Sequence, residues 1–346
     1  MSGERKIAVV TGTNSNLGLN IVYRLIEKED PNINLTIVVT SRTLPRVRET
    51  IDEIKKFVEK LNRPADVDYD YLLVDFTNMI SVLNAYNDLK KYKAIHYFFA
   101  NSALALNEGI DWVAATKQSL TAPLEAVTSP NYRIQKVGVK SKDGMGMVFQ
   151  ANVFGPYYLI QKILPQLSAG KAKIVWISSL LSKPEYLSFE DMQMIKSDIT
   201  YEGSKRLVDL LHSATYKDLA SRSITQYLVQ PGIFQSNSFN QFLNVFTYYG
   251  MLLMFYLARY LGSVWHNIDG YRAANSPVYV ATLSDDTIKD QMLKYGSATS
   301  WDGNGFIKTQ EIDTTGAEDV RKYIEDLKLE WDEKLKDQIV NTRIPI

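Results

Sequence analysis

Short apolar runs alternate with amphipathic helical patterns along most of this chain, and this alternation constrains the fold more than any other feature. In the first hundred residues the expected strands are 7–11, 35–40, 71–75 and 95–100, and the expected helices are 19–28, 44–61 and 79–91. Strands that are joined by helices pair in parallel, because each crossover returns the chain to the same end of the sheet. The sequence therefore predicts an α/β fold with a Rossmann-type, doubly wound parallel sheet that helices cover on both faces.

The alternation resumes after an irregular segment at 104–146 that mixes polar and apolar residues with Gly and Pro. The elements expected there are helices at 147–167, 200–219, 274–283 and 317–335, and strands at 173–177 and 225–229. No internal repeat and no long linker divides the 346 residues, so we predict one domain over 1–346. Its expected additions are insertions at about 104–146 and 183–199, and an apolar lid or membrane-docking segment at about 233–265.

Composition excludes several classes of function. Basic and acidic residues balance at 39 each, which gives no basic surface for nucleic acid. The absence of cysteine excludes disulfides and thiolate chemistry. His96, His212 and His266 lie far apart in the sequence, so we expect no metal site and predict that each is a packed or surface residue. The first residues show no secretory signal, which predicts a start in the cytosol or on the cytosolic face of a membrane.

A glycine-containing turn, Thr11-Gly-Thr-Asn-Ser-Asn-Leu-Gly18, joins the first strand to the first helix. Gly12 permits a tight turn, Gly18 allows close helix packing, and the helix N-terminus offers amide donors to a pyrophosphate. Asn16 occupies the place of a second glycine, and Asn tolerates a positive φ angle, so the turn is expected to survive. The turn predicts a dinucleotide site that includes Gly12, Asn16, Leu17 and Gly18.

The end of the second strand, Val39-Thr-Ser-Arg42, indicates which dinucleotide binds. An Asp or Glu there would bind the ribose hydroxyls of NAD, and neither is present. Arg42 can pair with a 2′-phosphate, so NADPH is the predicted cofactor. The alternative is an arginine that only closes a loop.

Tyr201 and Lys205 stand four residues apart, which places both on one face of a helix. The Lys205 ammonium is expected to lower the pKa of the phenol, and the Ser179 hydroxyl to hold a carbonyl oxygen against it. Such a site protonates an alkoxide while hydride arrives from elsewhere. The same spacing is also typical of a solvated helix face, so the pair indicates a catalytic site only together with other motifs of the chain.

Taken together, these motifs resemble the short-chain dehydrogenase/reductase family over about 6–232. The matching residues are Thr11, Gly12, Gly18, Asp75, Asn101, Asn152, Ser178, Ser179, Tyr201, Lys205, Pro231 and Gly232. The resemblance implies that Ser179, Tyr201 and Lys205 carry catalysis and that Asn152 completes a proton relay. It also implies a role for Asp75 in adenine binding, and the further cofactor contacts are Asn101, Tyr201, Lys205, Pro231 and Gly232.

The chain departs from the family pattern at three places. Asn16 replaces a glycine, and Asn101-Ser-Ala-Leu104 replaces Asn-Asn-Ala-Gly. Ser179 and Tyr201 lie further apart in the sequence than is usual for the family. The segment 183–199 is therefore expected to be an insertion beside the active site.

Nearly the whole chain is similar to the fungal 3-keto-steroid reductases, on stretches at 11–18, 123–127, 152–158 and 331–337. This resemblance implies NADPH-dependent reduction of the 3-ketone of a C-4 demethylation intermediate to the 3β-hydroxyl in ergosterol (zymosterol) biosynthesis. It implies a sterol substrate and a location at the endoplasmic reticulum membrane and the lipid droplet. The implied partners are the other sterol C-4 demethylation enzymes and lanosterol synthase (oxidosqualene cyclase).

An uncharged stretch of 36 residues lies between Arg222 and Arg259, and its apolar centre is 242–258. It follows Pro231-Gly232, where the family places its substrate lid. Spanning a bilayer takes about 20 apolar residues, so we expect the stretch to dock on a membrane or to cover a sterol, with Arg259 at its edge. The alternatives are a membrane span and an ordinary buried helix pair.

Three functions stay open on the residues alone. The first is an NADPH-dependent sterol ketone reductase. The second is a general carbonyl or retinoid reductase with the same chemistry. The third is a scaffold that holds a cyclase on the membrane, against which the complete set of Ser179, Tyr201, Lys205 and Asn152 argues.

Overall fold

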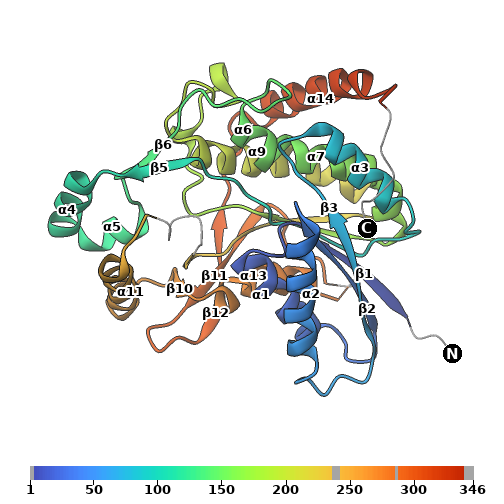
Figure 1. The fold of residues 1–346 in the computed structure, drawn as a ribbon, viewed down its shortest axis with the longest axis horizontal. Coiled ribbons are helices and arrows are strands. Elements are labelled where there is room, and N and C mark those ends of the chain that lie inside the picture. The colour runs from blue at the N-terminus through green and yellow to red at the C-terminus, as the bar shows by residue number, and fades with distance from the viewer. Residues whose placement is uncertain (1–3, 236–241, 285–286, 339–346) are drawn as a thin grey trace.

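An eight-stranded sheet forms the centre of the molecule in the computed structural model, which describes residues 4–235, 242–284 and 287–338 (Figure 1). Along the sheet the strands are β3 (Val67–Leu73), β2 (Asn34–Ser41), β1 (Arg5–Val10), β4 (Tyr97–Ala100), β7 (Lys173–Ile177), β8 (Thr225–Gln230), β11 (Leu293–Thr299) and β12 (Gly305–Glu311). All neighbours pair in parallel except β12, which runs antiparallel to β11 at the edge. The predicted α/β fold is therefore confirmed, with an antiparallel edge strand added.

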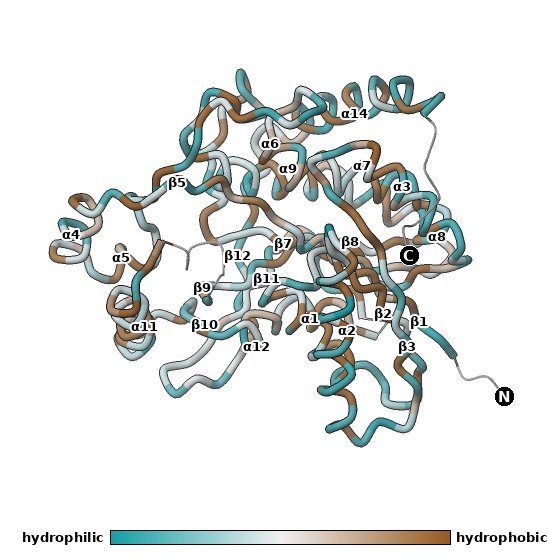
Figure 2. Tube along the Cα trace, viewed as in Figure 1, coloured by the Kyte–Doolittle hydropathy of each residue, from teal (hydrophilic) through white to brown (hydrophobic). Residues whose placement is uncertain are grey.

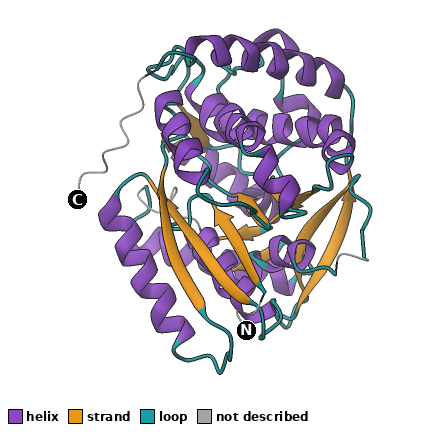
Figure 3. Cartoon of the chain, turned by 90° about the vertical axis from the view of Figure 1, so that its right-hand side faces the viewer, coloured by secondary structure: helices purple, strands orange, loops and turns teal. Residues whose placement is uncertain are grey.

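Helices cover both faces of this sheet (Figure 3). One face carries α1 (Asn16–Lys28), α2 (Leu44–Val58), α12 (Gly270–Ala273) and α13 (Asn275–Ala281), and the other carries α3 (Met79–Leu89), α7 (Gly155–Lys162), α9 (Thr200–Ala220) and α14 (Ala317–Lys334). Successive strand residues point to opposite faces, so Ala8 and Val10 join the α1 core while Val9 joins the α9 core. Apolar runs such as that of β1 are needed because both faces are buried.

The segment 104–146 forms a lobe beside the sheet, at the left of Figure 1. It contains the hairpin of β5 (Asn107–Ile110) and β6 (Arg133–Gln135), with α4 (Trp112–Thr121) and α5 (Pro123–Thr128) between its strands. Helix α11 (Val245–Tyr260) packs against α5, and β9 (Ile233–Phe234) pairs with β10 (His266–Ile268). The segment 183–199 holds two short 3-10 turns, η2 (Pro184–Tyr186) and η3 (Phe189–Asp191).

Three α-helical segments and one π-helical turn replace the single helix expected at 147–167. Its parts are α6 (Met147–Phe149), the π-helical η1 (Gln150–Phe154), α7 and α8 (Leu164–Ala169). Strand β3 begins four residues earlier than the predicted 71–75, and β11 and β12 were not predicted. Polar side chains such as Lys294 and Ser297 are buried in β11, and β12 has no buried side chain, so neither strand shows the apolar run expected of a buried strand.

Two of the three histidines are packed, as predicted. His212 and His266 are fully buried, and burial lowers the pKa of each imidazole to about 4. The described residues contain no group of His, Cys, Asp or Glu side chains that could hold a metal ion. Within the same residues, none of the helices has both the length and the apolar content required to cross a bilayer.

Candidate active site

A cleft of about 510 Å³ opens at the carboxyl ends of the central strands. Strand β1 pairs with β2 on one side and with β4 on the other, so the chain winds away from this point in both directions. Open α/β sheets bind ligands at such a switch point. The predicted site residues that line the cleft are Gly12, Asn16, Leu17, Arg42, Asp75, Asn101, Ser179, Tyr201, Lys205, Pro231 and Gly232.

Gly12 and Gly18 let the loop after β1 fold tightly under the cleft. Gly12 has a φ angle of 65°, and a Cβ on Gly18 would lie 2.3 Å from the Gly12 carbonyl oxygen. The Asn101 amide donates to the Thr11 carbonyl at 2.8 Å, and the Ser15 hydroxyl accepts from the Gly18 amide at 3.0 Å. The first turn of α1 therefore presents amides without intrahelical acceptors to the cleft, which is a cradle suited to a pyrophosphate.

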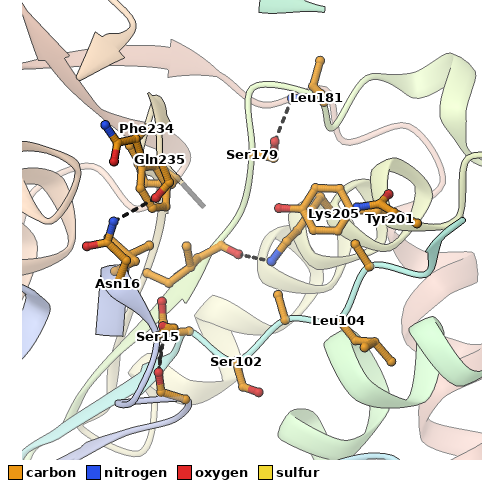
Figure 4. Close-up of a pocket in the computed structure, with 18 of the residues that line it drawn as sticks. Ser15, Asn16, Ser102, Leu104, Ser179, Leu181, Tyr201, Lys205, Phe234 and Gln235 are labelled. Carbon is orange, nitrogen blue, oxygen red and sulfur yellow. Dashed lines mark hydrogen bonds between the residues drawn. The ribbon is translucent and has the colours of Figure 1, made fainter. Parts of the chain in front are cut away.

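Asn16 does not have the positive φ angle expected from the sequence. It is the first residue of α1, and the helix imposes ordinary helical angles on it. Its side-chain amide instead donates to the Gln235 carbonyl at 2.8 Å (Figure 4). The Asn20 amide donates to the Asn16 side-chain oxygen at 3.0 Å. Asn16 thus ties the phosphate loop to the chain after β9.

Two arginines stand at the cofactor end of the cleft. Arg42 follows β2, and Arg46, which the sequence reasoning missed, lies four residues later in α2; both are exposed and line the cleft. Neither guanidinium forms an ion pair with a residue in the described part of the chain. Asp75 lies nearby, and its carboxylate accepts from the Thr77 amide at 3.0 Å and the Thr77 hydroxyl at 2.7 Å.

Ser179, Tyr201 and Lys205 converge on one wall of the cleft (Figure 4). The Lys205 ammonium lies 5.6 Å from the centre of the Tyr201 ring and donates to the Ile177 carbonyl at 2.7 Å. The Ser179 hydroxyl accepts from the Leu181 amide at 3.0 Å and lines the cleft together with the Tyr201 phenol. A phenol, a hydroxyl and an ammonium thus surround the same small volume.

The expected lowering of the Tyr201 pKa is wrong for the described structure. Burial and the neighbouring Glu202 carboxylate raise the pKa of Tyr201 to about 12, against smaller opposing effects of Arg133 and Ser179. Burial also lowers the pKa of Lys205 to about 8. Desolvation is the largest effect on the pKa of both groups, and the Lys205 ammonium donates to the Ile177 carbonyl. Tyr201 is therefore protonated at neutral pH, which is the form that a general acid needs.

Asn152 does not line the cleft. Its oxygen accepts from the Leu104 amide at 2.6 Å, and its amide donates to the Leu104 carbonyl at 2.9 Å and to the Ser204 hydroxyl at 3.0 Å. The side chain thus fixes the chain after β4 against α9. The role of Asn152 in a proton relay stays a prediction.

Ser178 is turned away from the reacting groups, which supports the choice of Ser179. The Ser178 hydroxyl donates to Asp209, and Asp209 also binds the Lys294 ammonium and accepts from Ser182 at 2.7 Å. This buried network lies one helical turn beyond Lys205, and its lysine comes from β11. The sequence analysis did not predict this network, although the four-residue spacing of Lys205 and Asp209 places both on one face of a helix.

Helix α11 closes the apolar end of the cleft. Met251 and Phe255 line the cleft together with Ala126 and Val127 from the region of α5. Arg259 does not lie at an interface edge as expected, because it is buried and donates to the carbonyls of His266 at 2.9 Å and Asn267 at 2.7 Å. The part of the predicted segment 233–265 at 236–241 lies outside the described residues.

Comparisons with known proteins agree with this geometry. The family model for the short chain dehydrogenase matches residues 6–244. A 3-keto-steroid reductase from Kluyveromyces lactis is 67% identical over 342 residues, which are 99% of each chain. A 3-keto-steroid reductase from Saccharomyces cerevisiae is 67% identical over 345 residues, again 99% of each chain.

Solved structures share the fold at low sequence identity. An NADPH-bound carbonyl reductase from chicken fatty liver has a TM-score of 0.53 at 16% identity, over 88% of this chain and 99% of that one. The RhlG/NADP active-site complex from Pseudomonas aeruginosa has a TM-score of 0.56 at 16% identity, over 82% of this chain and 92% of that one.

Proposed function

Because the chain belongs to the short-chain dehydrogenase family, we propose that it is an NADPH-dependent 3-keto-steroid reductase of ergosterol biosynthesis. The observation that carries the proposal is the convergence of Ser179, Tyr201 and Lys205 in a cleft with two distinct ends. One end carries the glycine loop and two arginines, and the other is apolar. The names of the full-length relatives support a 3-keto-steroid as the substrate.

The residues around the cofactor end suit NADPH. The first turn of α1 would hold the pyrophosphate, Arg42 and Arg46 the 2′-phosphate, and Asp75 the adenine. Pro231 and Gly232 would border the nicotinamide beside Tyr201 and Lys205. When bound, NADPH supplies the hydride for the carbonyl carbon.

The residues of the chain supply the proton and the orientation. Ser179 would donate a hydrogen bond to the carbonyl oxygen, and Tyr201 would transfer its phenolic proton to the same oxygen as the alcohol forms. Lys205 lies beside Tyr201 and would stabilise the phenolate that remains until a proton returns from solvent. Tyr201 is half-buried in the wall of the cleft, which would shield the reacting oxygen from part of the bulk water.

A panel of ketones tests the proposed substrate. The purified protein with NADPH should turn over 3-keto sterols with a higher kcat/KM than retinal or small ketones, because the apolar end of the cleft contributes binding energy only to a large apolar substrate. Equal kcat/KM values across the panel would favour a general carbonyl or retinoid reductase. No turnover of any ketone by folded protein would favour a scaffold.

Cofactor selection provides a prediction of its own. Arg42→Ala should weaken NADPH binding by about tenfold and leave NADH binding nearly unchanged, because a charge-assisted hydrogen bond to the 2′-phosphate is lost only in NADPH. Dissociation constants from fluorescence titration measure both effects. Arg48→Ala is the matched control. Arg48 is exposed like Arg42, but it lies on α2 and does not line the cleft. Equal weakening of both cofactors would remove Arg42 from this role.

We also propose that α4 and α11 dock the protein on a lipid bilayer. Helix α11 is largely hydrophobic in Figure 2, and its outward residues Phe246, Leu253 and Tyr260 are 88%, 68% and 70% exposed. On α4, Val113 and Leu120 are 81% and 80% exposed. Helices α11 and α5 border the apolar end of the cleft and α4 packs against α5, so a sterol would reach Tyr201 from the membrane without crossing water.

Vesicle flotation tests this docking. Wild-type protein should float with phospholipid vesicles, and the triple variant Phe246→Asp, Leu253→Asp, Tyr260→Asp should stay in the soluble fraction, because each buried Å² of apolar surface contributes roughly 25 cal/mol. Leu329→Asp is the control, since Leu329 is 65% exposed on the distant α14. Phe255 is unsuitable as a test residue because it faces the cleft. A triple variant that floats like the wild type would contradict the proposal, and a wild-type protein that never floats would indicate a protein partner on this face.

The site of action follows from the same proposal. A bilayer-docked sterol reductase would act at the endoplasmic reticulum membrane and the lipid droplet. The proposed partners are the other sterol C-4 demethylation enzymes and lanosterol synthase, and the resemblance to the fungal reductases is what supports them.

A further inference from the structure

The helix that carries Tyr201 and Lys205 begins without a cap from its own chain segment. Helix α9 starts at Thr200, and its N-cap residue Ile199 provides no side-chain acceptor. Buried helix starts need acceptors for their free amides. The side-chain oxygen of Gln135 takes this place, because it accepts from the Tyr201 amide at 3.0 Å and from the Thr200 hydroxyl at 2.9 Å. The cap therefore comes from β6, inside the segment 104–146.

A second contact links the same strand to the residue after Tyr201. Glu202 is 5% exposed, and its carboxylate accepts from the Gln135 amide at 2.6 Å and forms an ion pair with Arg133. Arg133 and Gln135 point to the same side of β6, because alternate strand residues share a face, while Ile134 between them points to solvent. Both polar residues of this short strand thus bind the first turn of α9.

We propose that Arg133 and Gln135 are positioning residues for ketone reduction, and that β6 clamps the first turn of α9 so that the Tyr201 phenol stays aligned with Ser179. This inference rests on the proposed function for the reaction that Tyr201 performs. The clamp itself is a feature of the protein without substrate.

The clamp also balances charge beside Tyr201. The charged groups that face the phenol are Glu202 and Lys205 on α9 and Arg133 on β6, and the Ser179 hydroxyl completes the surroundings. The Glu202 carboxylate raises the pKa of Tyr201 and the Arg133 guanidinium lowers it. Removal of one partner leaves the other as an uncompensated buried charge, whereas removal of both restores neutrality.

A set of three variants tests the charge balance: Arg133→Gln, Glu202→Gln and the double variant. Alcohol oxidation needs the phenolate, so its rate rises with pH as Tyr201 ionises. We expect this rise at higher pH in Arg133→Gln, at lower pH in Glu202→Gln, and near the wild-type position in the double variant. Each single variant should lose about tenfold in kcat of reduction, which is a part of the ~10² to 10⁴ that general acid catalysis contributes, and should bind NADPH with unchanged affinity. The inference would be overturned if, in both single variants, the rate of alcohol oxidation rose at the same pH as in the wild type and kcat of reduction equalled the wild-type value.

Hydrogen exchange tests the cap independently of catalysis. Gln135→Leu should accelerate exchange of the amides in the first turn of α9, whereas Ile134→Ala, on the solvent side of the same strand, should not. Equal exchange rates of these amides in both variants would overturn the clamp.

If Arg133→Gln does not bind NADPH, Arg133→Lys replaces it in the test. That variant retains the charge and should keep the wild-type pH profile with a reduced kcat. A wild-type protein that reduces no steroid would refute the proposed function, while the exchange measurement would still decide on the clamp.

Discussion

Tyr201→Phe is expected to abolish ketone reduction while the fold and the affinity for NADPH are retained. The substitution removes one hydroxyl and almost no volume from a half-buried residue, so packing is preserved. The reaction loses its proton donor, and general acid catalysis typically contributes ~10² to 10⁴ in rate. Single-turnover oxidation of NADPH in the presence of a ketone measures the loss.

The control for this experiment is Tyr216→Phe. Tyr216 lies on the same helix, α9, but it stacks on His212 and does not line the cleft. That variant should reduce ketones at the wild-type rate. Near-normal turnover by folded Tyr201→Phe would remove Tyr201 from the role of general acid.

Asp209→Ala is expected to have the largest effect on stability. Asp209 and Lys294 have side chains that are 2% and 9% exposed, and the carboxylate also accepts from Ser178 and Ser182. The substitution leaves the ammonium buried without its counter-ion, which costs about 3–5 kcal/mol of unfolding free energy. Urea denaturation followed by circular dichroism measures this loss.

Two comparisons isolate the buried pair. Glu330→Ala breaks an exposed ion pair with Lys334 and should cost only about 0–1 kcal/mol. The double variant Asp209→Ala, Lys294→Met should recover much of the loss, because no charge then stays buried without a partner. A cost for Asp209→Ala as small as that of Glu330→Ala would mean that the network does not stabilise the sheet around β11.

The sequence was sufficient to predict six of the eight strands of the central sheet and many of the residues that line the cleft. Apolar runs such as Ile7–Val10 must be buried on both faces, and the carboxyl ends of parallel strands meet at one edge. Chemistry-bearing residues after these strands therefore had to converge. The spacing of Tyr201 and Lys205 similarly fixed their common face on α9, and the structure places both in the cleft.

The interactions that tune the site could not be predicted, because they join segments that are distant in sequence. Gln135 caps a helix that begins 65 residues later, and Lys294 binds an aspartate 85 residues earlier. The pKa of Tyr201 also depends on how deeply the phenol is buried, which the spacing alone does not reveal. Arg46 was within reach, since it follows Arg42 by four residues at the start of α2.

Transfer of deuterium from labelled NADPH tests the central claim most directly. The protein would be incubated with a 3-keto sterol and NADPH carrying deuterium at C4 of the nicotinamide, in separate samples for the two faces of the ring. We predict that one of the two samples yields a 3-hydroxy sterol with a single deuterium on C3, in equal amount to the NADPH consumed, and that Tyr201→Phe yields none. An unlabelled sterol from both samples, or oxidation of NADPH without a 3-hydroxy product, would contradict the account.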